Sequence, residues 1–127
     1  MSEMGTFRTD IQIENPAAPG RRVTIPSALV DTGSELTWVP AAELESLGIG
    51  RDKQLRFILA DGRILTRSVG VARVYAAGTS TGDDVVFAEP GDSVLLGARS
   101  LEGLNVRVDP LRKQLIDAGP APAAAAA

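Results

Sequence analysis

The chain has 127 residues and a mass of 13.3 kDa, which is enough for one domain. It contains neither cysteine nor histidine, so disulfides, thiolate zinc sites, cysteine nucleophiles and Ser-His-Asp catalysis are all excluded. The 13 basic and 16 acidic residues give a net charge of −3 and form no basic block, which argues against binding to nucleic acid or a membrane surface.

Targeting signals are not evident in the sequence. Residues 1–13 lack the continuous apolar run of a signal peptide. No stretch approaches the roughly 18–20 apolar residues that a membrane-spanning helix requires. We therefore expect a soluble, cytoplasmic protein.

The first third of the chain is predicted to contain two strands and a short helix. Residues 7–13 alternate between apolar and polar with a period of two, which is typical of a half-buried strand. A turn with two prolines follows at 15–20, and a second strand is predicted over 21–30. Pro40 suits the first position of a helix, and Gly48 suits its end.

The middle of the chain is predicted to form a hairpin. Asp61-Gly62 is a strong two-residue turn signal between a strand at 55–59 and a long strand over 64–75. A second turn is predicted over 78–84 because it is polar and rich in glycine and threonine. A short buried strand is then predicted at 85–87.

The last third adds short elements and a tail. The apolar run 94–96 ends at Gly97, a second short helix is predicted over 98–104, and strands are predicted over 104–108 and within 111–116. We place the domain at residues 1–117 and a low-complexity Ala/Pro tail at 118–127. Seven or eight strands with two short helices predict an all-β fold, either a closed barrel or a sandwich.

One segment has the composition of a catalytic loop. Val30-Asp31-Thr32-Gly33-Ser34 places a carboxylate directly after a predicted buried strand. Gly33 permits a tight turn without side-chain bulk beside the acid, and the two hydroxyls can hydrogen-bond a carboxylate or the backbone. A plain strand-to-turn aspartate that caps a loop would look the same on these residues alone.

The wider context resembles a known family. Asp31-Thr32-Gly33-Ser34 through Trp38-Val39-Pro40 resembles the active-site loop of pepsin-like aspartic proteases, and Leu95-Leu96-Gly97 resembles the apolar-Gly segment of that superfamily. The hairpin tip Ala60-Asp61-Gly62-Arg63 comes about 30 residues after Asp31, as the flap does in retropepsins. Over residues 5–117 the chain is similar to a retropepsin-like, single-domain aspartic protease.

The resemblance implies an all-β, one-lobed retropepsin-like closed barrel and a homodimeric aspartic endopeptidase acting on extended peptides. Two carboxylates at about 3 Å cannot both be ionised, so one acts as acid and the other as base. This sequence has a single Asp-Thr-Gly, so the second catalytic Asp31 must come from another copy of the chain. The family requires no metal or organic cofactor.

The resemblance also implies roles for individual residues. Thr32 would lock the two loops across the dimer, Gly33 would let the substrate approach, and residues 60–63 would form the mobile tip of a flap over 59–64. The Ser34 hydroxyl, donating to the carboxylate, would lower the pKa of the pair and favour an acidic pH optimum. Residues 6–14 and 112–117 are the candidates for a terminal sheet shared between subunits.

Several predictions leave alternatives open. Asp61-Gly62 also fits a plain hairpin turn, and Trp38 fits core packing better than a direct role in a substrate pocket. Glu35 and Arg99 form either an ion pair or two solvated charges. Four apolar residues either line side-chain pockets or belong to the core: Leu29, Ile58, Val86 and Leu95. The alternative functions are a catalytically silent retropepsin-fold module that binds peptides or dimerises, and an unrelated ligand-binding barrel.

Overall fold

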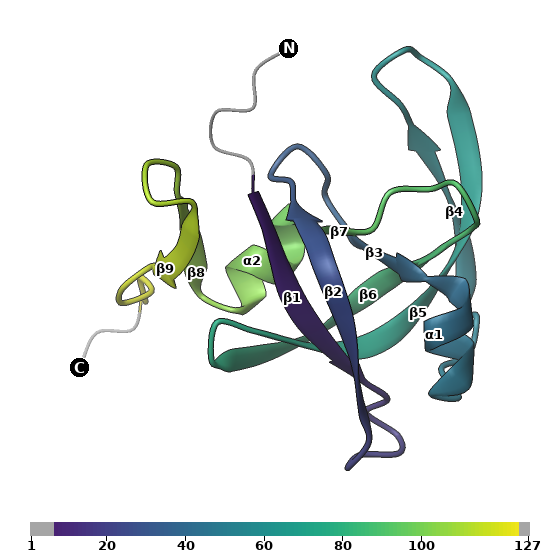
Figure 1. Ribbon diagram of the computed structural model, residues 1–127, viewed down its shortest axis with the longest axis horizontal. Coiled ribbons are helices and arrows are strands. Elements are labelled where there is room, and N and C mark those ends of the chain that lie inside the picture. Colours follow the sequence, from purple (N-terminus) through teal and green to yellow (C-terminus); the bar gives the residue numbers. More distant parts are fainter. Residues whose placement is uncertain (1–6, 125–127) are drawn as a thin grey trace.

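A computed structural model describes residues 7–124 of the chain. This part of the chain folds into strands with two short helices (Figure 1). The elements in chain order are β1 (Phe7–Glu14), β2 (Arg22–Val30), β3 (Thr37–Pro40), α1 (Ala41–Ser46), β4 (Lys53–Ile58), β5 (Ile64–Ala76), β6 (Thr79–Ala88), β7 (Leu95–Leu96), α2 (Ala98–Gly103), β8 (Val106–Asp109) and β9 (Gln114–Asp117). The predicted all-β fold with few helices is confirmed.

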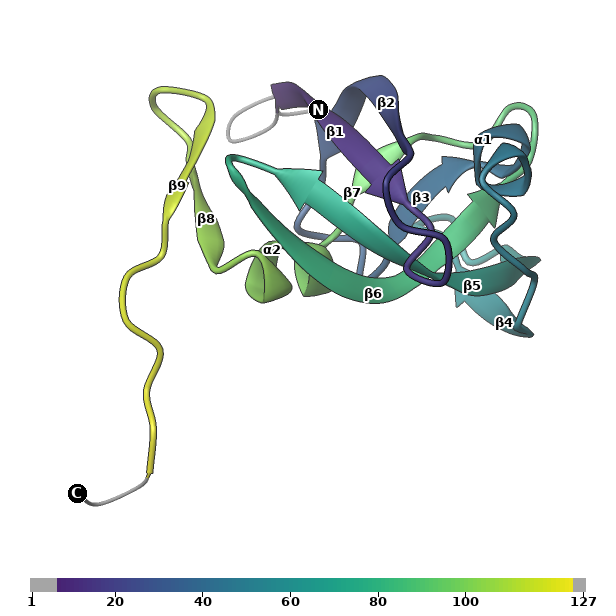
Figure 2. The same ribbon diagram turned by 90° about the horizontal axis from the view of Figure 1, so that it is seen from below.

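The main sheet closes on itself. Its strand order is β1-β2-β7-β3-β6-β5-β4, and a further antiparallel pairing of β1 with β5 joins its two sides into a ring, with β4 outside. Figure 2 shows the strands wrapping around a common interior. Most neighbours are antiparallel, but β7 runs parallel to β2, and β3 runs parallel to β6.

Two apolar clusters fill the interior. The larger one lies within the ring and includes Ile11, Ile13, Phe87 and Leu96, all almost fully buried. The alternation in β1 explains this placement, because successive side chains of a strand point to opposite faces. The second cluster, here called the hairpin-side cluster, consists of Leu36, Trp38, Val69, Val86, Ala88 and Leu95, with Leu29, Leu55 and Phe57 packed against it.

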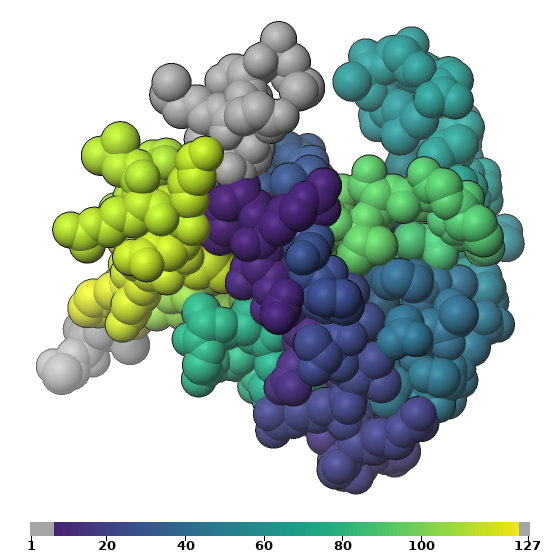
Figure 3. Space-filling view, in the orientation of Figure 1, coloured from purple at the N-terminus to yellow at the C-terminus, as the bar shows by residue number. Residues whose placement is uncertain are grey.

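The predicted hairpin is present, but three residues, Ala60-Asp61-Gly62, connect Leu59 to Arg63 in place of the predicted two-residue Asp61-Gly62 turn. The Leu59 amide donates to the Arg63 carbonyl at 2.8 Å, and Gly62 has a φ of +88°, a conformation that glycine adopts without strain. Strand β4 pairs with the first half of β5, and this hairpin extends away from the body of the molecule (teal in Figure 3).

The turn predicted over 78–84 is wrong. The turn contains only Ala77 and Gly78, both with positive φ, and β6 begins at Thr79. The polar residues of this segment pair in register with the second half of β5, from Ala76↔Thr79 to Val71↔Asp84. Composition suggested a loop, but Asp83 is buried within the strand because it has polar partners in the fold.

Two boundaries also differ from prediction. Pro40 ends β3 and caps α1, so the first helical residue is Ala41. The final strand is Gln114–Asp117, which pairs with β8 in a separate two-stranded sheet beside the ring (Figure 1). Thr6, which we included in the first terminal strand, lies outside the described residues.

The two residues after β9 are hydrogen-bonded to Asn105, which lies between α2 and β8. The Ala118 amide donates to the Asn105 carbonyl at 2.9 Å, and the Asn105 side chain donates to the Gly119 carbonyl at 2.9 Å. Residues 120–124 contain no helix or strand. Within residues 7–124, both helices are far too short to cross a membrane.

Candidate active site

Asp31 is the first residue after β2, and its backbone is fixed by the neighbouring strand. Leu29 and Val30 pair in parallel with Leu95 and Leu96, and the Asp31 amide donates to the Leu96 carbonyl at 3.0 Å. The Asp31 side chain is only partly buried. Buried apolar strands therefore hold the backbone of this residue and leave its carboxylate accessible.

The loop after Asp31 folds around its carboxylate. The Gly33 amide donates to Asp31 Oδ1 at 2.9 Å, and the Ser34 amide donates to the Asp31 carbonyl at 3.2 Å. A β-carbon on Gly33 would lie 3.2 Å from Asp31 Oδ1, which is a tight contact. Glycine at this position thus keeps space beside the acid. Thr32 and Gly33 are both exposed.

Helix α2 holds the far side of the same loop. The Ala98 amide donates to the Ser34 carbonyl at 2.8 Å, and the Arg99 amide donates to the Glu35 carbonyl at 3.0 Å. These contacts require Gly97, since a β-carbon there would lie only 2.4 Å from the Leu36 carbonyl oxygen. The Leu-Leu-Gly segment and the Asp-Thr-Gly-Ser loop are therefore packed backbone to backbone.

The predicted bond from Ser34 to the Asp31 carboxylate is wrong. The Ser34 hydroxyl donates to the Leu36 carbonyl at 2.9 Å. A serine has one hydroxyl proton, so this bond uses its donor within the loop backbone. Ser34 stabilises the loop and gives no support to an acidic pH optimum.

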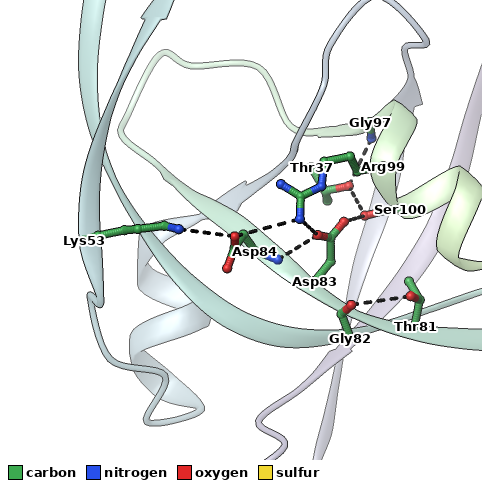
Figure 4. A network of polar contacts seen from close by, with 9 residues as sticks. All are labelled: Thr37, Lys53, Thr81, Gly82, Asp83, Asp84, Gly97, Arg99 and Ser100. Atoms are coloured by element: carbon green, nitrogen blue, oxygen red, sulfur yellow. Dashed lines mark hydrogen bonds and ion pairs between the residues drawn. The ribbon is translucent and has the colours of Figure 1, made fainter.

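A buried polar network lies behind the loop (Figure 4). The Gly97 amide donates to Thr37 Oγ1 at 3.0 Å, Thr37 Oγ1 lies 2.7 Å from Ser100 Oγ, and Ser100 Oγ donates to Asp83 Oδ2 at 3.0 Å. Since the proton of Ser100 goes to Asp83, Thr37 donates to Ser100. The chain of donors runs in one direction and ends on a carboxylate that is 8% exposed.

Arg99 completes this network and does not pair with Glu35. Its guanidinium lies 3.3 Å from Asp83 Oδ1 and 3.9 Å from Asp84 Oδ2, so Arg99 is neither paired with Glu35 nor simply solvated, the two alternatives that the sequence left open. The reason is that β6 extends as far as Thr79 and brings both aspartates beside α2. Lys53 on β4 lies 3.5 Å from Asp84. We call Thr37, Asp83, Gly97, Arg99 and Ser100 the Asp83 network.

Sequence reasoning missed the Asp83 network because it assigned Asp83 and Asp84 to a turn. Residues 79–84 read Thr-Ser-Thr-Gly-Asp-Asp, with no apolar alternation that would have predicted a strand. The partners lie 17 and 63 positions apart in the chain, and no local pattern joins them.

The four candidate pocket residues have different environments. Leu29 and Leu95 belong to the hairpin-side cluster next to the Asp31 strand. Val86 is fully buried and exposes no surface to a ligand. Ile58, at the end of β4, is 76% exposed and lies opposite Ile64, which is 51% exposed.

Trp38 is buried, as expected for core packing. Its ring centroid lies 5.1 Å from that of Phe57 on β4, with the planes inclined at 60°. Such tilted aromatic pairs are favourable beyond the area they bury. The pair connects the strand after the Asp31 loop to the projecting hairpin.

The hairpin tip is polar and internally bonded. The Asp61 carboxylate accepts the Arg63 amide at 3.0 Å and Arg63 Nε at 2.7 Å. These bonds hold the pKa of Asp61 below its usual value. All of residues 60–63 are exposed. No cluster of three or more metal-ligating side chains occurs between residues 7 and 124.

Comparison with known proteins agrees with this geometry. A family model described as aspartyl protease matches residues 17–100, which is more than half of the chain. The chain therefore belongs to the aspartyl protease family, and its fold is consistent with the retropepsin-like type. The matched span includes the Asp31 loop, the hairpin and Gly97. A search of curated proteins finds no match.

Proposed function

We propose that the protein is a homodimeric aspartic endopeptidase in which Asp31 from each of two copies forms the catalytic pair. The observation that supports this most directly is the state of the Asp31 carboxylate. It is partly exposed at the end of a buried strand, and its hydrogen bond comes from Gly33 of its own loop. A carboxylate held this way is oriented by the fold and still accessible to water and substrate.

The second carboxylate is proposed to come from a second copy. The other aspartates that sequence analysis considered are bound to cations: Asp83 to Arg99, Asp84 to Lys53, and Asp61 to Arg63. A two-fold axis beside the Asp31 loop would bring two identical carboxylates together, with the exposed Thr32 available to fix the loops against each other. Strands β1 and β9 are the candidates for a shared terminal sheet.

The proposed chemistry is hydrolysis by an activated water. One Asp31 carboxylate removes a proton from water, and the resulting oxygen nucleophile attacks the peptide carbonyl carbon. The other Asp31, protonated, donates to the carbonyl oxygen as negative charge develops there. Collapse of the tetrahedral intermediate breaks the C–N bond. The nitrogen receives the proton that the first Asp31 took from water, and the second Asp31 recovers its proton from the hydroxyl as the carbonyl re-forms. The products are a new carboxyl terminus and a new amino terminus.

The proposed substrate is an extended polypeptide. Among the strands of residues 7–124, β4 is at the edge of the main sheet and pairs only with β5, and an edge strand can pair with a peptide backbone. Leu29, Leu95 and the exposed Ile58 offer apolar surface for substrate side chains. The tip residues Ala60, Asp61, Gly62 and Arg63 are proposed to close over the bound peptide.

The test is peptide cleavage by the wild type and Asp31→Asn, from acidic to neutral pH, with and without a statine-type transition-state mimic. We expect cleavage that the substitution abolishes and the mimic blocks. Mixing the wild type with excess Asp31→Asn should also suppress activity, because mixed dimers hold one carboxylate. Cleavage that survives Asp31→Asn would contradict the proposal. A folded dimer that binds peptides without cutting them would favour the silent module.

A further inference from the structure

The projecting hairpin is tied to the body of the molecule by a second contact besides the Trp38–Phe57 pair. Arg67, in the first half of β5, donates from Nε to Asp92 Oδ2 at 2.7 Å and from Nη2 to Asp92 Oδ1 at 2.9 Å. The side chains are only 19% and 11% exposed. A bidentate, mostly buried pair of this kind fixes orientation as well as distance.

Asp92 is itself held rigidly. It lies in the loop between β6 and β7, where its amide donates to the Glu89 carbonyl at 2.9 Å and its Oδ2 accepts the Glu89 amide at 2.8 Å. Pro90 and Gly91, which has a φ of +92°, occupy the central positions of this turn and suit a type II geometry. The carboxylate is thus presented to Arg67 by a preformed turn.

The same loop leads directly to the strand beside Asp31. The Val94 carbonyl accepts the Leu29 amide at 3.0 Å, and Leu95 and Leu96 pair with β2. Figure 1 shows this loop reaching across to the base of the β4–β5 hairpin. One short segment therefore contacts both the hairpin and the strand that carries Asp31.

Beyond Arg67 the hairpin has little other support. Pairing of β5 with β6 begins at Val69, so residues 64–68 pair with β4. The side chains of Ile58 and Ile64 at its outer end are largely exposed. The position of the outer hairpin therefore depends on the Arg67–Asp92 pair and on the packing of Leu55 and Phe57 against the hairpin-side cluster.

We propose that Arg67 and Asp92 are positioning residues that set the orientation of the hairpin relative to the Asp31 loop and thereby control substrate binding. The part that concerns substrate rests on the proposed function, whereas the orientation of the hairpin does not. A lysine at position 67 would keep the charge but lose the planar fork, so the proposal predicts that Arg67→Lys is not conservative.

Trp38 provides a readout that does not require activity. It is the one tryptophan of the chain and contacts Phe57 on the hairpin. In Arg67→Lys and Asp92→Asn, we expect stronger quenching of Trp38 fluorescence by acrylamide, because the hairpin no longer covers the indole as closely. Asparagine retains an oxygen that can accept the Glu89 amide, so the turn itself should survive.

The kinetic expectation is a change in KM. Each variant should raise KM about 5- to 10-fold while kcat changes less than about 2-fold, since the pair acts on binding rather than on the reacting atoms. The double variant should be no worse than either single variant, because both remove the same contact. The control is Glu45→Gln, which breaks an exposed pair with Arg51 at 3.7 Å and should leave both readouts unchanged.

The outcomes separate the two proposals. Unchanged Trp38 quenching in both variants would overturn the positioning role, as would a rise in KM without a change in quenching. If the wild type cleaves no peptide yet both variants increase quenching, the proposed function fails and the positioning of the hairpin stands. Circular dichroism at the assay temperature confirms that each variant is folded.

Discussion

Asp31 and Asp83 are two aspartates whose surroundings differ in almost every respect. Asp31 is partly exposed and accepts a hydrogen bond from the amide of Gly33 in its own loop. Asp83 is buried and accepts bonds from Ser100 and the Asp84 amide, with Arg99 at 3.3 Å. Asp83 itself contacts α2, whereas Asp31 is connected to α2 only through Ser34 and Glu35 of its loop.

The difference shows that this fold uses one aspartate, Asp83, for stability and leaves the other, Asp31, accessible for the proposed catalysis. A buried carboxylate whose oxygens are bound by a cation and two donors cannot contact a substrate. A carboxylate with one local donor and access to solvent can. The Asp83 network holds Gly97, which packs against the loop of Asp31, so the structural aspartate supports the proposed catalytic one.

The same substitution, aspartate to asparagine, should affect activity at Asp31 and stability at Asp83. The largest expected effect is the loss of activity at Asp31. Asp31→Asn should reduce peptide cleavage by on the order of 10³-fold or more, because the amide cannot accept the proton of water. The free energy of unfolding should change little, since Asp31 is partly exposed. Cleavage kinetics and urea unfolding on the same preparation check both statements. A large loss of stability would mean that Asp31 is a structural residue.

Asp83→Asn should show the opposite behaviour. Loss of the charge opposite Arg99 and of a charged acceptor for Ser100 should lower the free energy of unfolding by about 1–3 kcal/mol. Activity per folded molecule should remain within a few-fold of wild type. Asp84→Asn is the control, because its more exposed contacts at 3.5 and 3.9 Å should contribute less than about 1 kcal/mol. Equal effects at the two positions would contradict the assigned network.

Gly33→Ala tests whether activity depends on the space that glycine leaves beside the Asp31 carboxylate. The new methyl would lie 3.2 Å from Asp31 Oδ1, so the carboxylate must shift slightly while the exposed loop remains folded. We expect kcat to fall about tenfold or more, because small misplacement of a reacting group is costly. Gly97→Ala should instead destabilise the whole fold, since its methyl would meet the Leu36 carbonyl oxygen at 2.4 Å. Thermal unfolding alongside kcat distinguishes these outcomes.

The smallest expected effect concerns a third carboxylate, that of Glu14 at the end of β1. Tyr75 donates to Glu14 at 2.5 Å, and this bond is the main reason that the pKa of Glu14 is lowered, with Gly20, Arg22 and Arg73 adding to it. A lowered pKa in the folded state stabilises the protein at neutral pH, and that stability is lost as the pH falls through the folded value. Tyr75→Phe should therefore move the onset of acid unfolding to slightly higher pH. An unchanged profile would show that Glu14 does not contribute.

The sequence determined the features that depend on neighbouring residues. Alternation in residues 7–13 fixes β1, Asp61-Gly62 fixes the hairpin turn, and the Asp31-Thr32-Gly33-Ser34 segment identifies the candidate site. In each case the side-chain period or the backbone preference of a residue acts within a few positions. The family could be recognised from the sequence because its motifs also consist of neighbouring residues.

Tertiary structure alone decided which polar groups meet. Asp83 belongs to a strand because Ser100 and Arg99 approach it from α2, and Ser34 donates to Leu36 because the loop closes on itself. Arg67 finds Asp92 across 25 positions of sequence. Apolar burial follows a periodic pattern that a sequence displays, whereas a buried polar bond requires one specific partner whose position is set only when the chain has folded.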